Sequence, residues 1–200
     1  MAVFAVQPGL PVKTIQELIA LAKAKPGALT FGSTGIGTVS HLTFELFCSM
    51  AGISMTHVPY KGTAQATNDF LAGQIDLRTL SIPIALPLLK TGRARVLSVN
   101  GRLRSPLLPE VPTVDEAGVP GYEDITFNGL VAPAGTPREI LVRLNRAVAD
   151  AVRAHDLYNR FIERGVELKA SASPEEFTGH IRAEFEKKGR LAREAGIKAE

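Results

Sequence analysis

The sequence predicts an α/β protein built on a mainly parallel sheet with helices on both faces. Two observations support that class. Over residues 1–99, short apolar runs typical of buried strands alternate with segments whose apolar residues recur at helical spacing. The composition is that of an ordinary globular chain, with 45% hydrophobic and 22% charged residues among 200. Because strands that alternate with helices are joined by crossovers, neighbouring strands are expected to run parallel.

The first element is the apolar run from Met1 to Pro8, which has no signal-peptide pattern and is predicted to be a core strand. Thr14 is predicted to cap the first helix, with Glu17 completing a capping box. The next elements are predicted as a strand at 29–31, a helix at 38–50, a strand at 54–58, a helix at 63–72, a strand starting at 74–77, a helix at 84–90 and a strand at 95–99. The predicted apolar stripe of the helix at 38–50 consists of Val39, Leu42, Leu46 and Phe47, with Thr43 off it.

The remaining residues have a different character. Prolines and glycines punctuate residues 101–122, which are predicted to be surface loop with one short helix at 113–117. The elements predicted after that are a strand at 125–132, a long helix capped by Thr136 with Pro137 at its first position, a short helix ending near Gly165, a strand at 167–170 and a terminal helix opened by Ser173 and Pro174. Two strands form a weak sheet on their own, so these helices are expected to need a sheet that this chain does not supply.

The loop from Gly32 to His41 lies between a predicted strand and a predicted helix and is rich in glycine and hydroxyl residues. Such a turn is expected to leave several backbone N–H groups unpaired and pointing outward. The positive end of the helix dipole adds to their field, so the loop predicts a site for a carboxylate or a phosphate. The alternative is a glycine-rich turn that serves only the backbone.

Three enzyme motifs are approached in this loop, and none is complete. A phosphate-binding loop needs a lysine where Thr38 stands, and a dinucleotide fingerprint needs a glycine where Ser40 stands. A nucleophile elbow centred on Ser33 needs a glycine where Phe31 stands. No cofactor is predicted. The next strand–helix junction carries Tyr60, Lys61 and Gly62 at the same expected sheet edge, where Lys61 could attract anions.

Composition excludes several other functions. The net charge of +3 is small and scattered, and no basic block alternates with aromatic residues, so nucleic acid is not expected as a partner. The apolar runs are too short to span a bilayer. Cys48 is the single cysteine and is expected to be a packing residue. The four histidines share no metal-ligand spacing, so no metal site is predicted.

Several longer motifs, taken in order, resemble the solute-binding proteins of tripartite tricarboxylate transporters, also called the Bug family. The resemblance covers essentially all 200 residues. The motifs are Pro11-Val12-Lys13-Thr14-Ile15-Gln16-Glu17-Leu18, Ala24-Lys25-Pro26-Gly27, the glycine loop with Ser40-His41-Leu42, His57-Val58-Pro59-Tyr60-Lys61-Gly62, Leu108-Pro109-Glu110-Val111-Pro112-Thr113-Val114, Gly118-Val119-Pro120-Gly121-Tyr122 and Gly129-Leu130-Val131-Ala132-Pro133-Ala134-Gly135-Thr136-Pro137.

The resemblance implies a two-domain periplasmic receptor of the type II, Venus-flytrap kind. Such a receptor closes on a small carboxylic acid and delivers it to membrane permease subunits, without catalysis. Residues 1–122 would be domain two, and residues 123–200 the returning carboxy-terminal part of domain one. Roughly a hundred residues, a domain-scale segment, would precede Met1 in the family pattern, so the chain is expected to be a fragment or a truncated product.

The resemblance also assigns residues. Ser33, Thr34, Gly35, Gly37 and Thr38 match the family's ligand-carboxylate loop. Ser40 is expected to satisfy an N–H group of the first helical turn, and His41 to anchor the helix through a buried hydrogen bond.

The third strand–helix junction departs from the family, because Leu80 stands where an acid is usual and Thr79 where an aromatic residue is usual. Arg78 is unusual in a buried strand. Thr79 and Ser81 remain possible hydroxyl donors to a ligand. Two rival hypotheses stay open, namely an anion- or nucleotide-binding enzyme domain and a truncated remnant that binds nothing.

Overall fold

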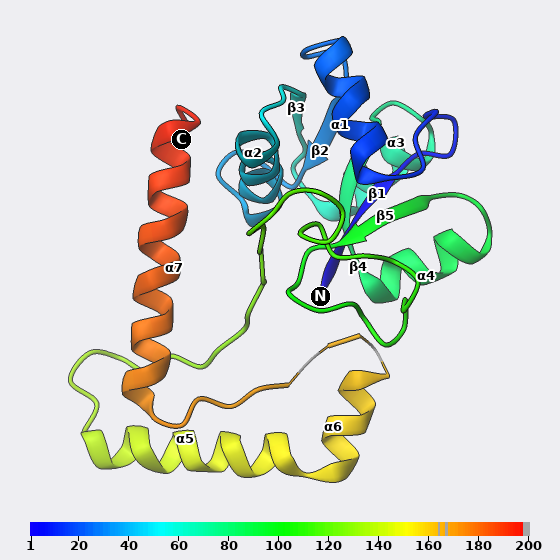
Figure 1. Ribbon diagram of the computed structural model, residues 1–200. Helices are drawn as coiled ribbons and strands as arrows, with labels where there is room; N and C mark the ends of the chain where they lie inside the picture. The colour runs from blue at the N-terminus through cyan, green and yellow to red at the C-terminus, as the bar shows by residue number, and fades with distance from the viewer. Residues whose placement is uncertain (164, 167, 198–200) are drawn as a thin grey trace. The chain divides into compact units, whose positions relative to one another are not determined.

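The computed structural model describes residues 1–163, 165–166 and 168–197, and these form two compact units (Figure 1). Unit 1 comprises Met1–Thr126 with the segment that starts at Leu191, and unit 2 comprises Phe127–Arg190. The elements are β1 (Ala2–Val6), α1 (Ile15–Ala24), β2 (Thr30–Ser33), α2 (Val39–Ala51), β3 (Thr56–Pro59), α3 (Thr63–Leu71), β4 (Leu77–Ser81), α4 (Ile82–Lys90), β5 (Arg95–Val99), α5 (Arg138–Arg153), α6 (His155–Ile162) and α7 (Pro174–Glu194).

Unit 1 contains a five-stranded sheet with the strand order β3-β2-β4-β1-β5. Strand β2 is parallel to β3 and to β4, whereas β1 is antiparallel to β4 and to β5. It follows that β2, β3, β4 and β5 run in one direction and that β1 alone is reversed. The predicted α/β class with a mainly parallel sheet is confirmed.

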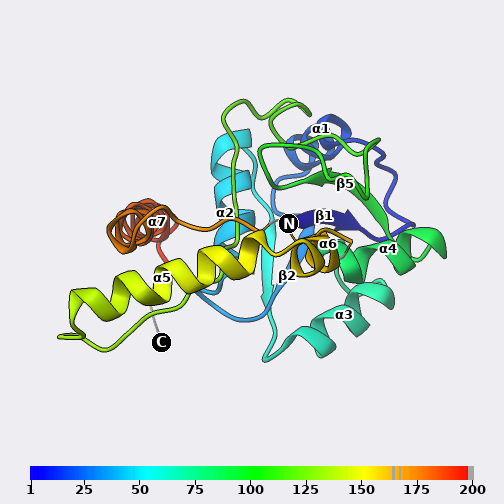
Figure 2. The same cartoon turned by 90° about the horizontal axis from the view of Figure 1, so that it is seen from below.

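Helices cover both faces of the sheet, with α1 on one side of the strands and α3 and α4 on the other (Figure 2). Helices α1 and α2 contribute to a core that includes Phe4, Phe31 and Phe44, and the Phe31 and Phe44 rings stack with centroids 4.5 Å apart. Helices α3 and α4 contribute to a second core that includes Phe70 and Ile82. Burial of both faces explains why the strands appear in the sequence as continuous apolar runs.

Helix α1 begins as predicted. The backbone N–H of Glu17 donates to Thr14 Oγ1 over 3.1 Å, and the Glu17 carboxylate accepts from the N–H of Lys13 over 2.6 Å. The buried face of α2 differs from the predicted stripe, because Val39 is 45% exposed whereas Thr43 is buried. The reason is that the Thr43 hydroxyl donates to the buried carboxylate of Asp124, which makes burial of this polar side chain tolerable.

The segment between β5 and unit 2 contains a correction. The helix predicted at 113–117 is a turn in which the Thr113 hydroxyl accepts from the N–H of Glu116 over 3.1 Å and the Glu116 carboxylate accepts from the N–H of Thr113 over 2.8 Å. These residues satisfy each other as in a capping box, but the chain turns at Gly118, where φ is +102°, before a helix can continue.

In unit 2 the described residues are helical or irregular. The prediction of a strand at 125–132 is wrong, because these residues form no strand. The strand predicted at 167–170 includes Glu167, which lies outside the described residues, and residues 168–170 are irregular. Pro137, not Thr136, is the N-cap of α5, and the Thr136 hydroxyl instead donates to the Pro133 carbonyl over 2.8 Å. No residue of α5 is buried.

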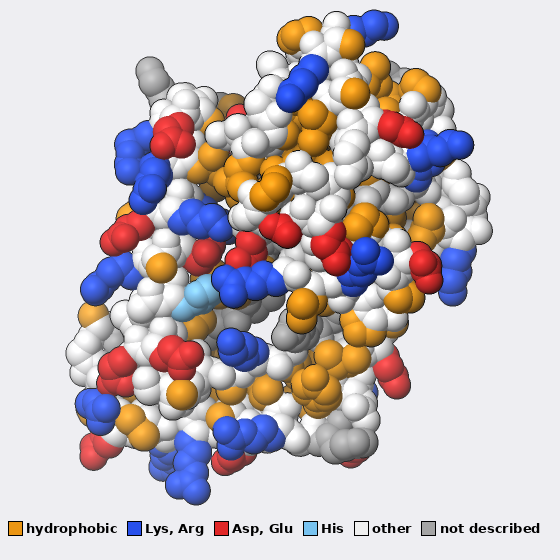
Figure 3. All heavy atoms as spheres, in the orientation of Figure 1, with side chains coloured by type: hydrophobic (Ala, Val, Ile, Leu, Met, Phe, Trp, Pro, Cys, Tyr) orange, Lys and Arg blue, Asp and Glu red, His pale blue; other side chains and the backbone are white. Residues whose placement is uncertain are grey.

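Hydrophobic side chains therefore remain at the surface of unit 2 among charged ones (Figure 3). The exposed large ones are Phe127, Leu130, Val131, Ile140, Val142, Leu144, Tyr158 and Phe185. None of the helices in the described part of the chain is long and apolar enough to cross a membrane.

Candidate functional site

The candidate site lies at the edge of the sheet where β2, β3 and β4 end. Strand β2 is central to it, and its last residue, Ser33, pairs with Pro59 at the end of β3. The chain leaves β2 towards α2 on one face of the sheet, whereas it leaves the neighbouring strands β3 and β4 towards α3 and α4 on the other face. Such a divergence is a topological switch point, where ligands bind in open α/β sheets.

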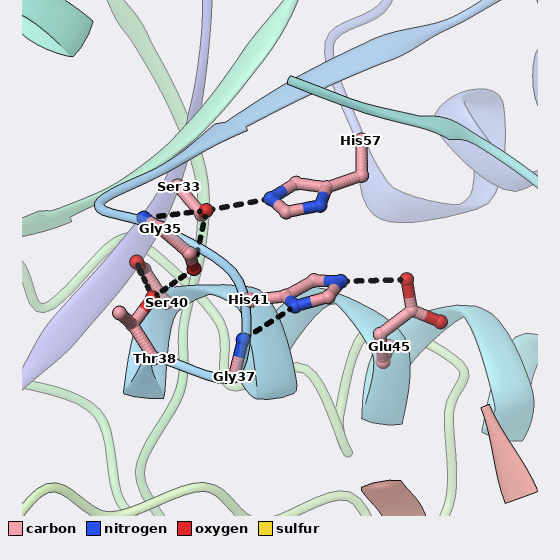
Figure 4. A network of polar contacts seen from close by, with 8 residues as sticks. All are labelled: Ser33, Gly35, Gly37, Thr38, Ser40, His41, Glu45 and His57. Carbon is pink, nitrogen blue, oxygen red and sulfur yellow. Dashed lines mark hydrogen bonds and ion pairs between the residues drawn. The ribbon is translucent and has the colours of Figure 1, made fainter. Parts of the chain in front are cut away.

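The loop between β2 and α2 is braced from within by hydroxyl groups (Figure 4). Ser33 Oγ accepts from the N–H of Gly35 over 3.1 Å, and the Thr38 hydroxyl donates to the Gly35 carbonyl over 2.7 Å. Ser40 Oγ accepts from the N–H of Thr34 over 3.0 Å, so it holds the start of the loop and not, as predicted, the first helical turn. Two glycines of the loop, Gly35 and Gly37, have positive φ values of 131° and 72°, which glycine adopts without steric cost.

His41 anchors the loop to the helix, as expected. Its Nδ1 atom accepts from the N–H of Gly37 over 3.1 Å, and the side chain is buried. His57 on β3 lies beside it, with its Nε2 atom 2.6 Å from Ser33 Oγ. Burial, reinforced by the His41 ring, lowers the pKa of His57 to about 4, so the ring is neutral at neutral pH.

The prediction of unpaired loop N–H groups is correct only in part. The N–H groups of Thr34, Gly35, Gly37 and Thr38 are paired inside the loop. Within the described residues, no acceptor contacts the N–H groups of Val39, Ser40 and His41, which open the thirteen-residue helix α2. The first turn of α2 is therefore the part of the site where an anion could be bound, and Ile36 and Val39 border it with exposed fractions of 43% and 45%.

At the second junction, Tyr60 and Lys61 differ in exposure. The ring of Tyr60 is buried in the second core, and burial together with a hydrogen bond to Asp69 raises its pKa. Lys61 is exposed, and Gly62 is the N-cap of α3. Close packing explains why residue 32, on the neighbouring strand β2, is a glycine. A Cβ atom there would lie 3.3 Å from the Tyr60 ring and 2.3 Å from Ile75 Cδ1.

The third junction places Thr79 and Ser81 at the end of β4, where Thr79 is half-buried and Ser81 is exposed at the N-cap of α4. Leu80 is buried in the second core. Arg78 is buried too, and its Nη1 atom donates to the Thr63 carbonyl over 2.9 Å and to the Thr67 hydroxyl. Burial lowers the pKa of Arg78, and these bonds hold the first turn of α3 against β4.

Sequence reasoning missed two contributions to the site. One is His57, for which the sequence predicts no role at the site. The other is the Thr43–Asp124 pair, which joins α2 to the chain segment just before unit 2. Asp124 directly follows another acid, Glu123, and nothing in the sequence connects it to a threonine 81 positions away. In the described residues no group of three or more His, Cys, Asp or Glu side chains is arranged to hold a metal ion.

Fold and edge site together define the class of the protein: an α/β chain with the type II fold of periplasmic binding proteins. The family profile described as "Tripartite tricarboxylate transporter family receptor" matches residues 1–197. The chain belongs to this receptor family, as its motifs suggested.

Individual relatives support the same placement. The chain is 36% identical over 188 residues to the "UPF0065 protein in tcbD-tcbE intergenic region" of Pseudomonas sp. strain P51, a match that covers 94% of this chain and 56% of that protein. The solved structure "R. palustris Rpa4515 with adipate" is 37% identical in sequence, with a TM-score of 0.85. The match covers 98% of this chain and 65% of the chain in that structure. The structure of the "periplasmic binding protein BugD" is 26% identical in sequence, with a TM-score of 0.78. The match covers 100% of this chain and 67% of the chain in that structure. The chain thus spans little more than half the length of its curated relative.

Proposed function

We propose that this chain is the solute-binding part of a carboxylate receptor that delivers its ligand to the membrane permease subunits of a tripartite transporter in the periplasm. Residues 1–122 would serve as domain two of the receptor and residues 123–200 as the returning part of domain one. The observation that carries the proposal is the first turn of α2, where three N–H groups lack acceptors within the described residues at a switch point of the sheet.

The surroundings of that turn favour a small acid with an aliphatic body. The N–H groups suit carboxylate oxygens, and the exposed side chains of Ile36 and Val39 beside them suit methylene groups. On the neighbouring junctions, Lys61 would contribute charge, Thr79 and Ser81 hydroxyl contacts, and Gly62, the N-cap of α3, its backbone. A structural relative is described with adipate, which has this chemistry, so adipate is the probe of choice.

An enzymatic role has less support. Ser33 Oγ and His57 Nε2 are as close as a nucleophile and its base. However, Ser33 is only 1% exposed, and the His57 ring stacks on His41. The pair holds the loop in place and offers no exposed hydroxyl to a substrate. We propose binding without catalysis.

The test is a calorimetric titration of adipate into three forms of the chain: wild type, Gly37→Asp and Gly37→Asn. A Cβ atom at Gly37 meets nothing within 4 Å, and Asp and Asn tolerate the left-handed backbone similarly, so the two variants differ mainly by one charge. We expect adipate to bind wild type and Gly37→Asn, and Gly37→Asp to weaken binding by at least about tenfold through repulsion of the carboxylate. Equal affinities for the Asp and Asn variants would contradict the proposal, as would the absence of binding by wild type.

A further inference from the structure

Two imidazole rings stack beneath the ligand loop. His41 on α2 and His57 on β3 have ring centroids 3.7 Å apart and planes inclined by 12° (Figure 4). The ring of Phe31 on β2 stacks on His57 with a centroid separation of 4.9 Å. Three aromatic rings from three elements thus form one stack under the loop that joins β2 to α2.

Each imidazole bonds one end of the loop. His57 contacts Ser33 Oγ, and Ser33 in turn accepts from the N–H of Gly35 at the beginning of the loop. His41 accepts from the N–H of Gly37 at the end of the loop. The stack therefore fixes the distance between Gly35 and Gly37. These residues lie just before the first turn of α2, which carries the unpaired N–H groups.

The bond from Gly37 fixes the protonation state of His41. Because the Gly37 N–H donates to Nδ1, that nitrogen carries a lone pair, and the ring proton must be on Nε2. Nε2 lies 3.4 Å from Glu45 Oε1, one helical turn along α2. A second proton on the ring, at Nδ1, would make both Nδ1 and the Gly37 nitrogen hydrogen-bond donors. With no acceptor between them, the bond to Gly37 would be lost.

Few charged groups face the stacked imidazole rings. Glu45 on α2 is the carboxylate that faces His41, and it favours a charged ring, whereas burial opposes the charge and outweighs it, so the pKa of His41 is lowered. From β2 the facing groups are Phe31 and Ser33, which carry no charge, and from β3 the facing group is His57. Two imidazolium rings 3.7 Å apart would repel each other strongly, so the stack accommodates at most one charge.

We infer that His41 and His57 are positioning residues for the carboxylate-binding loop, and that protonation of His41 in acid releases the Gly37 end of the loop. The inference rests on the proposed function in so far as the loop binds the ligand. It assigns the receptor an acid-sensitive loop, which holds its ligand at neutral pH and loosens as the pH falls.

The first test measures amide hydrogen exchange of Gly37 in the full chain at about pH 7, and needs no ligand. Asn places its Oδ1 atom where His presents Nδ1, so His41→Asn should retain protection of the Gly37 amide, whereas His41→Phe should speed its exchange by at least about fivefold, the equivalent of one net hydrogen bond. His57→Gln should likewise retain the protection of Gly35 that His57→Phe loses. Phe4 in the inner strand β1, which pairs with β4 and β5, serves as the control for overall stability. Equal exchange in the Asn and Phe variants of His41 would overturn the inference.

The second test follows Gly37 protection as the pH is lowered from about 7.5 to about 4.5. Protection should fall in wild type. Because Glu45 stabilises the charged form of His41, Glu45→Gln should shift the midpoint of that fall to lower pH. A merely structural histidine would not produce such a shift. Protection that stays constant with pH, or a midpoint that Glu45→Gln does not move, would contradict the acid-sensitive loop.

A third measurement separates the inference from the proposed function. At about pH 7, adipate should bind His41→Asn nearly as well as wild type and His41→Phe more weakly. If the exchange data follow expectation but wild type binds no dicarboxylate, the histidine pair positions the loop and the proposed function fails. If adipate binds equally to all variants while the exchange data follow expectation, the loop is positioned but does not bind the ligand, and the inferred role in binding is wrong.

Discussion

At the scale of single residues, His57 is held neutral by its neighbours. The rings of Phe31 and His41 stack on it, and Ser33 occupies its Nε2 atom. These contacts remove water from a group that would otherwise be half-charged near pH 6.5. The cost of charging it in the folded state links the stability of the whole chain to pH.

That linkage has a definite sign. The pKa of His57 is about 4 in the folded chain and close to 6.5 when unfolded, so between these values the unfolded state binds the extra proton. Stability is therefore expected to fall as the pH drops from about 7 to about 4. The measurement is the change in Tm between about pH 7 and about pH 5 for wild type and for His57→Gln, which cannot take up that proton. A smaller change in the variant is expected, and an equal change would show that His57 does not contribute.

Sequence reasoning found the loop residues but not their partners. Ser33, Gly35, Gly37 and Thr38 could be identified because glycines and hydroxyls between a strand and a helix are a local signal. The role of Ser40 as a brace for Thr34, and the pairing of Ser33 with His57, depend on how β2, β3 and α2 pack. Periodicity and spacing along the chain carry no information about those contacts.

At the scale of secondary-structure elements, a local signal was reliable at the start of α1 and failed at the start of α5. The box formed by Thr14 and Glu17 at the start of α1 was predicted from four adjacent positions and has the expected bond. A similar box opens α7, where the N–H of Glu176 donates to Ser173 Oγ over 3.1 Å. Both depend only on residues within one turn.

The box on α1 leads to a stability prediction. Thr14→Ala removes the acceptor for the N–H of Glu17 at the helix start and is expected to lower the free energy of unfolding by about 1 kcal/mol. Urea denaturation of wild type and variant gives the difference. Thr14→Ser, which keeps the hydroxyl oxygen, is the matched control and is expected to lose only a fraction of that amount. A loss as large for Ser as for Ala would assign the effect to the methyl group and not to the cap.

Predictions that needed a distant partner failed. Residues 125–132 have the composition of a strand, but a strand requires a neighbour to accept its hydrogen bonds, and Leu130 and Val131 are 74% and 83% exposed. The orientation of α2 was also misjudged. Its buried face includes Thr43 because Asp124, far along the chain, supplies a hydrogen-bond partner that hydrophobic periodicity does not register.

At the scale of the whole molecule, the hydrophobic core belongs to unit 1. Both core clusters are composed entirely of residues between Met1 and Tyr122, whereas α5 in unit 2 buries none of its side chains. Within unit 2, the described residues include no strand against which the apolar side chains of α5 could pack.

This division predicts that residues 1–126 fold on their own. A polypeptide of these residues contains all five strands and both cores, so it should show a cooperative thermal transition in circular dichroism, with a Tm within a few degrees of the full chain. The full chain, measured in parallel, is the reference. A broad transition, or a Tm far below the reference, would show that later residues are needed to stabilise the sheet.

Cys48 has a practical consequence for all of these measurements. It is the single cysteine of the chain and is 7% exposed, and burial raises the pKa of its thiol to about 12, so it is almost entirely in the unreactive thiol form at neutral pH. The natural chain is therefore expected to react little with maleimides. A fluorophore attached through Ile36→Cys, at an exposed position of the loop between β2 and α2, would be the sole label, and a change in its emission on addition of adipate would test the proposed binding.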